Sequence, residues 1–391
     1  MILAGAHLIL PDRIQRAGHL RIEQGLIADV SAEPLVPRAG EEVIPLEGLY
    51  IAPGFIDLHI HGALGRDAMD ATADSFETIC RHHATGGTTS LCLTTIAAPL
   101  DQILAVLDAA RKYRCSEQSG KSGARVLGIH IEGPYFSPKK KGAHLPYLLR
   151  NPEPEEWRRL LDYADVITEM TLAPELPGAL PLIDALAGRG IIASVGHSDA
   201  WDDEVAAAFA HGLRQATHTF NCMSTSRRRG PFRTAGVLEY VLSEPDILCE
   251  AIADGRHISP TLLHLLCRAK GAGGIALITD ATAGAGLPEE AHFTLGDMTC
   301  VVRDQVALTA DGTALAGSTC TMIRGVRTMV DQCGLSFVEA VQMASLNPAR
   351  ALHLDRQKGS IAPGLDADLV MLTPDLAVRQ TWVAGRPIHN V

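Results

Sequence analysis

The sequence of 391 residues has little of what marks several common classes of protein. No Cys-x-x-Cys pair occurs among its nine cysteines, which argues against a thiolate zinc site or a disulfide framework. No apolar run approaches the ~18 residues that a membrane-spanning helix needs. Lysine and arginine number 34 against 45 aspartates and glutamates, and the net charge of −11 disfavours nucleic acid and anionic membranes as partners.

The remaining composition is that of a globular protein. With 47% hydrophobic and 20% charged residues, the chain is long enough to bury a large core. The scattered cysteines are expected to be small buried side chains in a reducing compartment. The N-terminus, MILAGAHLILPDR, lacks the basic segment and apolar core of a signal peptide. Together these features predict a cytoplasmic protein.

Two hydrophobic patterns divide the chain. Residues 1–50 and the last thirty or so residues carry short alternating stretches broken by Gly and Pro, which are typical of hairpins. We therefore expect a small β-sandwich domain built from both chain termini, over residues 1–50 and 356–391. Between them, eight short β-branched runs, from GFIDLHIHG to GGIALITDA, alternate with helical patterns. This alternation predicts an α/β fold, a (β/α)8 TIM-like barrel over residues 51–355.

A doubly wound parallel sheet is the alternative architecture. It is disfavoured because no Gly-x-Gly-x-x-Gly follows the first predicted strand. On the barrel pattern, the loop around His144 and the stretch 290–312 are expected to be insertions.

Polar residues fall at the ends of six of the eight predicted strands. In a (β/α)8 barrel these C-terminal strand ends carry the catalytic groups. One histidine at such a position is commonly structural. Chance alone, however, would not place polar residues at the ends of so many strands. The residues are His59, His61, Glu132, His197, His218, Asp254 and Asp280.

Three of these residues have the chemistry of a metal site. Glu132, His197 and His218 supply one carboxylate and two imidazoles, the usual ligands of a catalytic zinc with an open fourth position. Asp280 would lie beside that position as general base, although alone it would be interpreted as a strand cap. His59 and His61 share one face of their strand because side chains alternate along it.

Two basic clusters stand out against the acidic background, Lys139–Lys141 and Arg227–Arg229. The arginines follow the His218 strand end in a loop with Asn221, and arginine suits bidentate binding of phosphate. An anionic substrate group is therefore expected there. A solvated face is the alternative, and for the lysines it stays open.

A set of short motifs, in this order, resembles the amidohydrolase superfamily and, within it, the N-acetylglucosamine-6-phosphate deacetylase family. The resemblance covers essentially the whole chain, and EGP followed by GAH, GHS, FNxM and DGxH is specific to this group. The motifs are PGFIDLHIHG (53–62), GGTTS (86–90), HIEGPYFSPKKKGAH (130–144), VGHSDA (195–200), THTFNCM (217–223), ADGRH (253–257), ITDA (278–281) and LAGS (315–318).

The resemblance implies hydrolysis of the N-acetyl group of N-acetylglucosamine-6-phosphate, a small-molecule sugar phosphate, by a homodimer. It implies a divalent metal, foremost Zn²⁺, held by Glu132, His197 and His218, with Asp280 as catalytic acid and base. Family members with His-x-His on the first strand can hold a second ion. The resemblance thus allows one ion per chain, or two if His59, His61 and Asp280 form a second site.

The resemblance also implies roles for residues around the metal. His144 would be catalytic and would orient or polarise the amide carbonyl. Arg229 would reach the phosphate in the neighbouring subunit, although STSRRRGPF departs from the common form of this loop. The full set of expected substrate-binding residues is Ala143, His144, Asn221, Cys222, Arg229, Asp254, His257, Leu315, Ala316 and Gly317.

Three other functions stay open. N-acetylgalactosamine-6-phosphate differs from the first substrate only in one hydroxyl configuration. A cyclic-amide hydrolase such as a dihydroorotase would use a bridging lysine on the fourth strand, which reads VITEMTLAPE and has none. A catalytically inactive sugar-phosphate sensor would have lost metal ligands, whereas all are present here.

Overall fold

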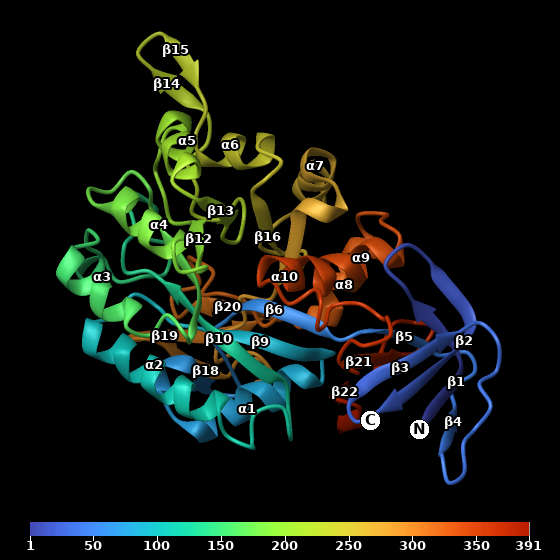
Figure 1. Cartoon of the computed structure of the whole chain (residues 1–391). Coiled ribbons are helices and arrows are strands. Elements are labelled where there is room, and N and C mark those ends of the chain that lie inside the picture. Colours follow the sequence, from blue (N-terminus) through green and yellow to red (C-terminus); the bar gives the residue numbers. More distant parts are fainter. Residues whose placement is uncertain (391) are drawn as a thin grey trace.

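The computed structural model describes residues 1–390, and its larger part is a barrel of eight parallel strands (Figure 1). The strands follow one another around the barrel in chain order. They are β6 (Phe55–Ile60), β9 (Thr88–Thr94), β10 (Arg125–Glu132), β11 (Ile167–Leu172), β12 (Ile192–Val195), β13 (Leu213–Ala216), β16 (Leu248–Ile252) and β17 (Ile275–Ile278). Seven of the eight lie within the predicted runs, and β13 begins two residues before its run, QATHTFN (215–221). The predicted fold class is confirmed.

The barrel closes between its first and last strands. The Asp280 N–H donates to the His59 carbonyl at 2.9 Å, and the His61 N–H donates to the Ala281 carbonyl at 2.8 Å. These two bonds place the end of β6 directly beside the segment that follows β17. The sequences of these strands are largely continuous apolar runs, because both faces of each strand are buried: helices cover the outer face and side chains fill the inner face.

Helices surround the strands (Figure 1). Helix α1 (Ala73–Ala84) shows why they form: the Thr72 side chain caps its first turn, and Phe76, Ile79 and Cys80 recur on its buried face. The other helices are α2 (Leu100–Arg114), α3 (Pro154–Leu161), α4 (Ala179–Ala187), α5 (Asp202–Ala210), α6 (Val237–Ser243), α7 (Pro260–Lys270), α8 (Met322–Asp331), α9 (Phe337–Ala344) and α10 (Leu346–Ala351).

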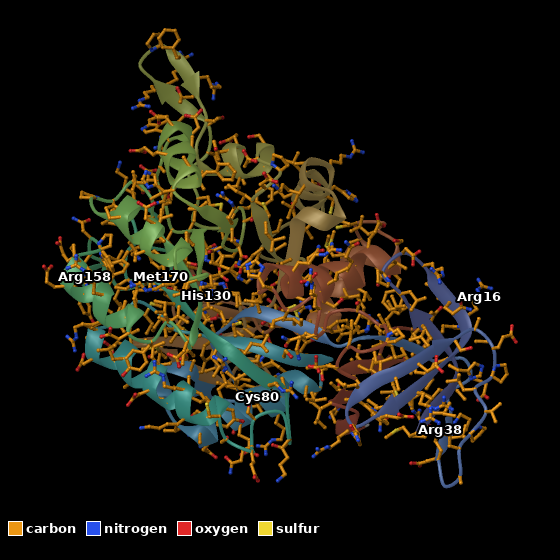
Figure 2. The ribbon with its side chains drawn as sticks, in the orientation of Figure 1. Arg16, Arg38, Cys80, His130, Arg158 and Met170 are labelled. Carbon is orange, nitrogen blue, oxygen red and sulfur yellow. The ribbon has the colours of Figure 1, made fainter. Side chains whose placement is uncertain are left out.

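Side chains fill the interior of the barrel (Figure 2). His130 and Met170 lie fully buried among the strands, whereas Arg158 lies at the periphery. All nine cysteines are free, and six of them are buried, in agreement with the expectation from their spacing. In residues 1–390, no helix is both long and apolar enough to cross a membrane.

Both chain termini contribute to a second sheet beside the barrel (Figure 1). It has its own apolar core, which includes Leu8, Ile51 and Trp382. The predicted boundaries near residues 50 and 355 stay predictions. The strands of this sheet are β1 (Ile2–Ile9), β2 (Ile14–Glu23), β3 (Leu26–Ser31), β4 (Val43–Pro45), β5 (Tyr50–Pro53), β21 (Leu369–Leu372), β22 (Val378–Val383) and β23 (Arg386–Asn390).

Further short elements lie outside the barrel strands and the terminal sheet. The stretch expected to be an insertion forms an antiparallel sheet of β18 (His292–Leu295), β19 (Met298–Arg303) and β20 (Val306–Thr309). The arginine cluster forms a projecting hairpin of β14 (Arg227–Arg229) and β15 (Phe232–Thr234) (Figure 1). The short pieces are β7 (Gly62–Ala63), β8 (Arg66–Asp67), and the 3-10 turns η1 (Ala68–Asp70), η2 (Pro138–Lys140), η3 (Pro146–Leu148) and η4 (Ala272–Gly274).

Candidate metal centre

The structure brings together the three side chains expected to bind metal. The Glu132 Oε1 atom lies 3.2 Å from His197 Nε2 and 3.1 Å from His218 Nε2, and the two nitrogens are 3.1 Å apart. Glu132 ends β10, and the histidines follow β12 and β13. Because these three atoms lie so close together, their free electron pairs face one small volume. All three side chains are buried, so this volume is shielded from solvent.

Hydrogen bonds on the far side of the rings fix which nitrogen faces this volume. His197 Nδ1 lies 2.8 Å from the Lys140 carbonyl, and His61 Nδ1 lies 3.2 Å from the Thr94 carbonyl. Since a carbonyl can only accept, each Nδ1 carries the proton and each Nε2 keeps its electron pair for a ligand. Metal-binding histidines in proteins are held in this way. The donor set therefore fits a divalent cation.

A second group of donors adjoins the first. His61 Nε2 lies 3.2 Å from His59 Nε2 and 3.2 Å from Asp280 Oδ1, and Glu132 Oε2 is 3.4 Å from His61. Glu132 thus faces both groups. Burial alone would raise the pKa of Asp280, but His59 and His61 together hold it well below its usual value. Asp280 is accordingly a carboxylate, able to accept a proton or bind a cation.

The backbone at this centre is unusual. His197, His218 and Asp280 have φ angles of 49°, 33° and 49°, in the left-handed region that residues other than glycine seldom adopt. Strain of this kind persists where the surrounding fold enforces it, and it clusters at functional sites. All three residues lie just beyond a strand, where the chain turns away from the barrel axis.

His144 reaches the centre from the loop after β10 and presents a proton to it. Its Nδ1 accepts from the Ala97 N–H at 3.3 Å, so Nε2 carries the proton and lies 3.5 Å from Glu132 Oε2. Burial lowers the pKa of His144 to about 4, which keeps the ring neutral. Gly142 lets this loop approach closely, because a Cβ there would lie 3.0 Å from the His197 ring. His144 is thus placed to donate to a carbonyl oxygen.

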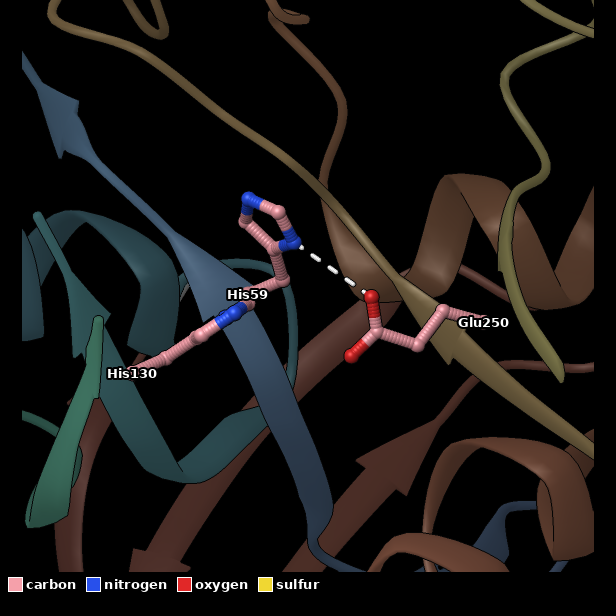
Figure 3. A group of neighbouring side chains, drawn as sticks. All are labelled: His59, His130 and Glu250. Carbon is pink, nitrogen blue, oxygen red and sulfur yellow. Dashed lines mark hydrogen bonds and ion pairs between the residues drawn. The ribbon is translucent and has the colours of Figure 1, made fainter. Parts of the chain in front are cut away.

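Glu250 on β16 contacts His59 and His218, two of the candidate metal ligands, and was not expected from the sequence. Its Oε2 accepts from His59 Nδ1 at 3.3 Å (Figure 3). The same oxygen accepts from the His218 backbone N–H at 3.2 Å. Its Oε1 accepts from Gln215 Nε2 at 2.9 Å. His130, also drawn in Figure 3, stacks edge-on against His59 at 4.5 Å between ring centres. With these three bonds, Glu250 positions the ring of one histidine and the backbone of another.

Asp57 on β6 was also missed. Its carboxylate accepts from the N–H and the hydroxyl of Thr279 at 3.1 and 2.5 Å, and from the His59 N–H at 3.3 Å. It therefore ties β6 to the segment that carries Asp280. Two sequence signals could have found these carboxylates. Asp57 shares the alternating face of His59 and His61, and Glu250 interrupts an apolar strand.

A cavity of about 270 Å³ opens above the centre. The expected substrate-binding residues that line it are Ala143, His144, Asn221, Cys222, His257, Leu315 and Gly317. Asp254 and Ala316 are not among the lining residues. Asp254 instead supports the site from behind, since its Oδ2 accepts from His257 Nδ1 at 2.8 Å.

Arg229 lies outside the cavity of its own chain. It is exposed on the β14–β15 hairpin, forms an ion pair with Asp203 at 2.9 Å and lies over the Trp201 ring. Neither lysine nor arginine occurs among the residues that line the cavity. Lys139 similarly pairs with Asp199 at 3.0 Å, whereas the carbonyls of Lys140 and Lys141 accept from the His197 ring and the His144 N–H.

Comparisons with known proteins agree with this geometry. Residues 50–388 match the model of the amidohydrolase family. The N-acetylglucosamine-6-phosphate deacetylase of Vibrio furnissii is 38% identical, with 89% of this chain and 85% of the relative covered. The N-acetylgalactosamine-6-phosphate deacetylase of Escherichia coli O157:H7 is 37% identical, with 94% and 93% covered.

Two solved structures are similar along their whole length. The N-acetylglucosamine-6-phosphate deacetylase of Pasteurella multocida superposes with a TM-score of 0.91 at 32% identity, covering 99% of this chain and 98% of the other. A mutant of the Mycobacterium smegmatis deacetylase, in complex with N-acetyl-D-glucosamine-6-phosphate, gives 0.90 at 33% identity, covering 99% of each chain. By its sequence, its fold and the residues gathered at the mouth of its barrel, the chain belongs to the amidohydrolase family.

Proposed function

We propose that this protein hydrolyses the N-acetyl group of N-acetylglucosamine-6-phosphate and releases glucosamine-6-phosphate and acetate. One observation carries the proposal: a proton donor, His144, and a carboxylate, Asp280, flank the same group of metal-binding side chains in one cavity. The named activity of the relatives, which extend over nearly the whole chain, supports it.

In this proposal Glu132, His197 and His218 hold a divalent cation, foremost Zn²⁺. His59, His61 and Asp280 would hold a second ion where one binds. When bound, such a cation lowers the pKa of water from ~15.7 towards ~7 and withdraws electrons from a carbonyl group.

The chain's own residues supply the proton transfers. His144 donates its Nε2–H to the amide oxygen, where negative charge develops as water adds to the carbonyl carbon. Asp280 takes a proton from the attacking water and then delivers it to the nitrogen. That delivery is needed because an amide anion is too basic to leave.

The sugar is proposed to lie against Asn221, Cys222 and His257, with the 315–317 loop beside it. Its phosphate needs cationic partners, and neither lysine nor arginine lines the cavity of one chain. We propose that Arg229, exposed on the projecting hairpin, reaches the site of a partner in a cytoplasmic homodimer. A charge-assisted contact of this kind contributes roughly 1.5 to 3 kcal/mol, or about 10- to 150-fold in affinity.

The galacto substrate is the second candidate, because the relative at 37% identity carries that name. Release of the free amino sugar should be followed from both 6-phosphates and from unphosphorylated N-acetylglucosamine, with dihydroorotate as a cyclic-amide control. The proposal expects the gluco 6-phosphate to give the highest kcat/KM. A higher kcat/KM for the galacto epimer would identify that epimer as the substrate. Turnover of dihydroorotate alone would contradict the proposed deacetylation.

Mixed dimers test the role of Arg229. Arg229→Ala and Asp280→Asn chains are each expected to be poorly active, but a mixed dimer holds one site with an intact Asp280 and the partner's intact Arg229. Activity should therefore recover on mixing. If no activity returns, or if the protein is a fully active monomer, Arg229 does not act across an interface.

A further inference from the structure

Part of the cavity wall is apolar, and the proposed deacetylation assigns no role to the residues that form it. We call this apolar part of the cavity the acyl annex. It is formed by segments that follow β6, β9 and β10 and by the end of β18. Its lining residues are Met69, Ile96, Ala98, Pro99, Leu148 and Leu295.

The annex and the polar side of the cavity lie across the barrel from each other. In the closed order of eight strands, β9 stands opposite β13, and β10 stands opposite β16. Ile96 and Leu148 belong to the loops after β9 and β10. Asn221 and His257 belong to the loops after β13 and β16. The metal-binding side chains lie between these two sides.

An amide that reacts at this centre must span both sides. Its planar trans geometry directs the nitrogen substituent and the acyl chain to opposite ends. With the carbonyl carbon between His144 and Asp280, the sugar on nitrogen extends towards Asn221 and His257. The acyl group then extends towards the annex.

We propose that the acyl annex is a subsite for N-acyl chains longer than acetyl, so that the protein also deacylates N-propionyl and N-butyryl hexosamine 6-phosphates. This inference rests on the proposed deacetylase function and deepens it. The reaction keeps its balance: the C–N bond breaks, the water oxygen joins the acyl carbon, and the water protons leave on the amine and the carboxylic acid. No co-reactant other than water is needed.

The chemistry of the walls fits an aliphatic chain. The polar residues near the annex, Gln102, Tyr147 and Asp297, are exposed at the mouth. Two of them are hydrogen-bonded to each other, since the Tyr147 hydroxyl donates to the Asp297 carboxylate at 3.0 Å. The interior thus offers apolar surface behind a polar rim, as small-molecule cavities commonly do. An acetyl methyl group would leave most of that surface uncovered.

A series of substrates tests the annex directly. Glucosamine-6-phosphate release is measured for N-acetyl, N-propionyl, N-butyryl and N-hexanoyl glucosamine-6-phosphate. Burial of a methylene contributes ~0.8 kcal/mol, so kcat/KM should rise by up to about fourfold per added carbon until the annex is full. A fall at propionyl with normal turnover of acetyl would overturn the annex alone. Loss of turnover with every member would overturn the deacetylase function as well.

A variant that fills the annex gives a second readout. Ile96 is half-buried and faces Gly296 of the insertion, where a Cβ would lie 2.9 Å from its Cδ1. Ile96→Phe should lower the butyryl-to-acetyl ratio of kcat/KM at least tenfold. The same exchange outside the cavity, Ile323→Phe on α8, should leave the ratio at its wild-type value. An unchanged ratio in folded Ile96→Phe would contradict the proposal, and the wild-type series decides the question if the variant does not fold.

Discussion

Replacing Glu250 with glutamine should weaken the metal centre without altering any proposed metal ligand. The carboxylate accepts three hydrogen bonds, from the His59 ring, the His218 backbone and Gln215. A glutamine has only one acceptor oxygen, and its NH₂ group would face a donor. If the NH₂ group faces His59 and His218, these residues must shift; if it faces Gln215 instead, the neutral oxygen holds them less strongly than a carboxylate does. Loss of such a supporting contact typically costs 10- to 100-fold in metal affinity.

The assay is competition for zinc between the protein and a chromogenic chelator, with metal content measured per chain. Glu250→Gln should bind zinc about 10- to 100-fold more weakly than the wild type. The matched control is Glu117→Gln, which alters an exposed glutamate in the loop after α2. Wild-type zinc affinity and stoichiometry in folded Glu250→Gln would refute the reasoning that Glu250 orients the ligands.

Three further predictions concern catalysis, pH and stability. Asp280→Asn should lower kcat at least ~10²-fold with little change in KM, and a loss confined to KM would make Asp280 a binding residue only. Burial lowers the pKa of His257, but its bond to Asp254 outweighs this and raises the pKa overall. Affinity for the phosphorylated substrate should therefore be present at low pH and fall as pH rises through this raised pKa. Asp254→Asn should move that fall to lower pH, and an unmoved KM–pH profile would contradict the pairing. The buried Asp368 carboxylate lies 2.7 Å from the Lys358 ammonium and also accepts from the Ala384 N–H. Lys358→Met removes the cationic partner of this carboxylate. It should lower the free energy of unfolding by about 3 to 5 kcal/mol in urea denaturation, whereas a change below ~1 kcal/mol would show that the pair is not needed.

The sequence predicts the barrel well because the pattern of each strand and helix lies within a short stretch of the chain. Eight β-branched runs alternate with helices, and each run overlaps one strand of the barrel. Helix α6 (Val237–Ser243) was not expected, because it spans only seven residues. In such short segments the helical period is hardly repeated, and tertiary packing decides the conformation.

The candidate site is predictable where one strand end carries one functional residue. Glu132, His197 and His218 were expected because parallel strands bring their C-terminal ends together. Glu250 and the Lys140 carbonyl were not, because their role depends on the direction of hydrogen bonds in three dimensions. The role of Arg229 across an interface stays a prediction, since Arg229 pairs with Asp203 and does not line the cavity of its own chain.

Restoring activity to metal-stripped protein tests the central claim most directly. Zinc is added in known amounts to chelator-treated protein, and glucosamine-6-phosphate release from N-acetylglucosamine-6-phosphate is measured at each step. The account predicts that activity returns and saturates at one or two ions per chain, and that Glu132→Gln recovers little of it. Undiminished hydrolysis by the stripped protein, or full recovery in Glu132→Gln, would contradict the claim that this cluster forms the active centre.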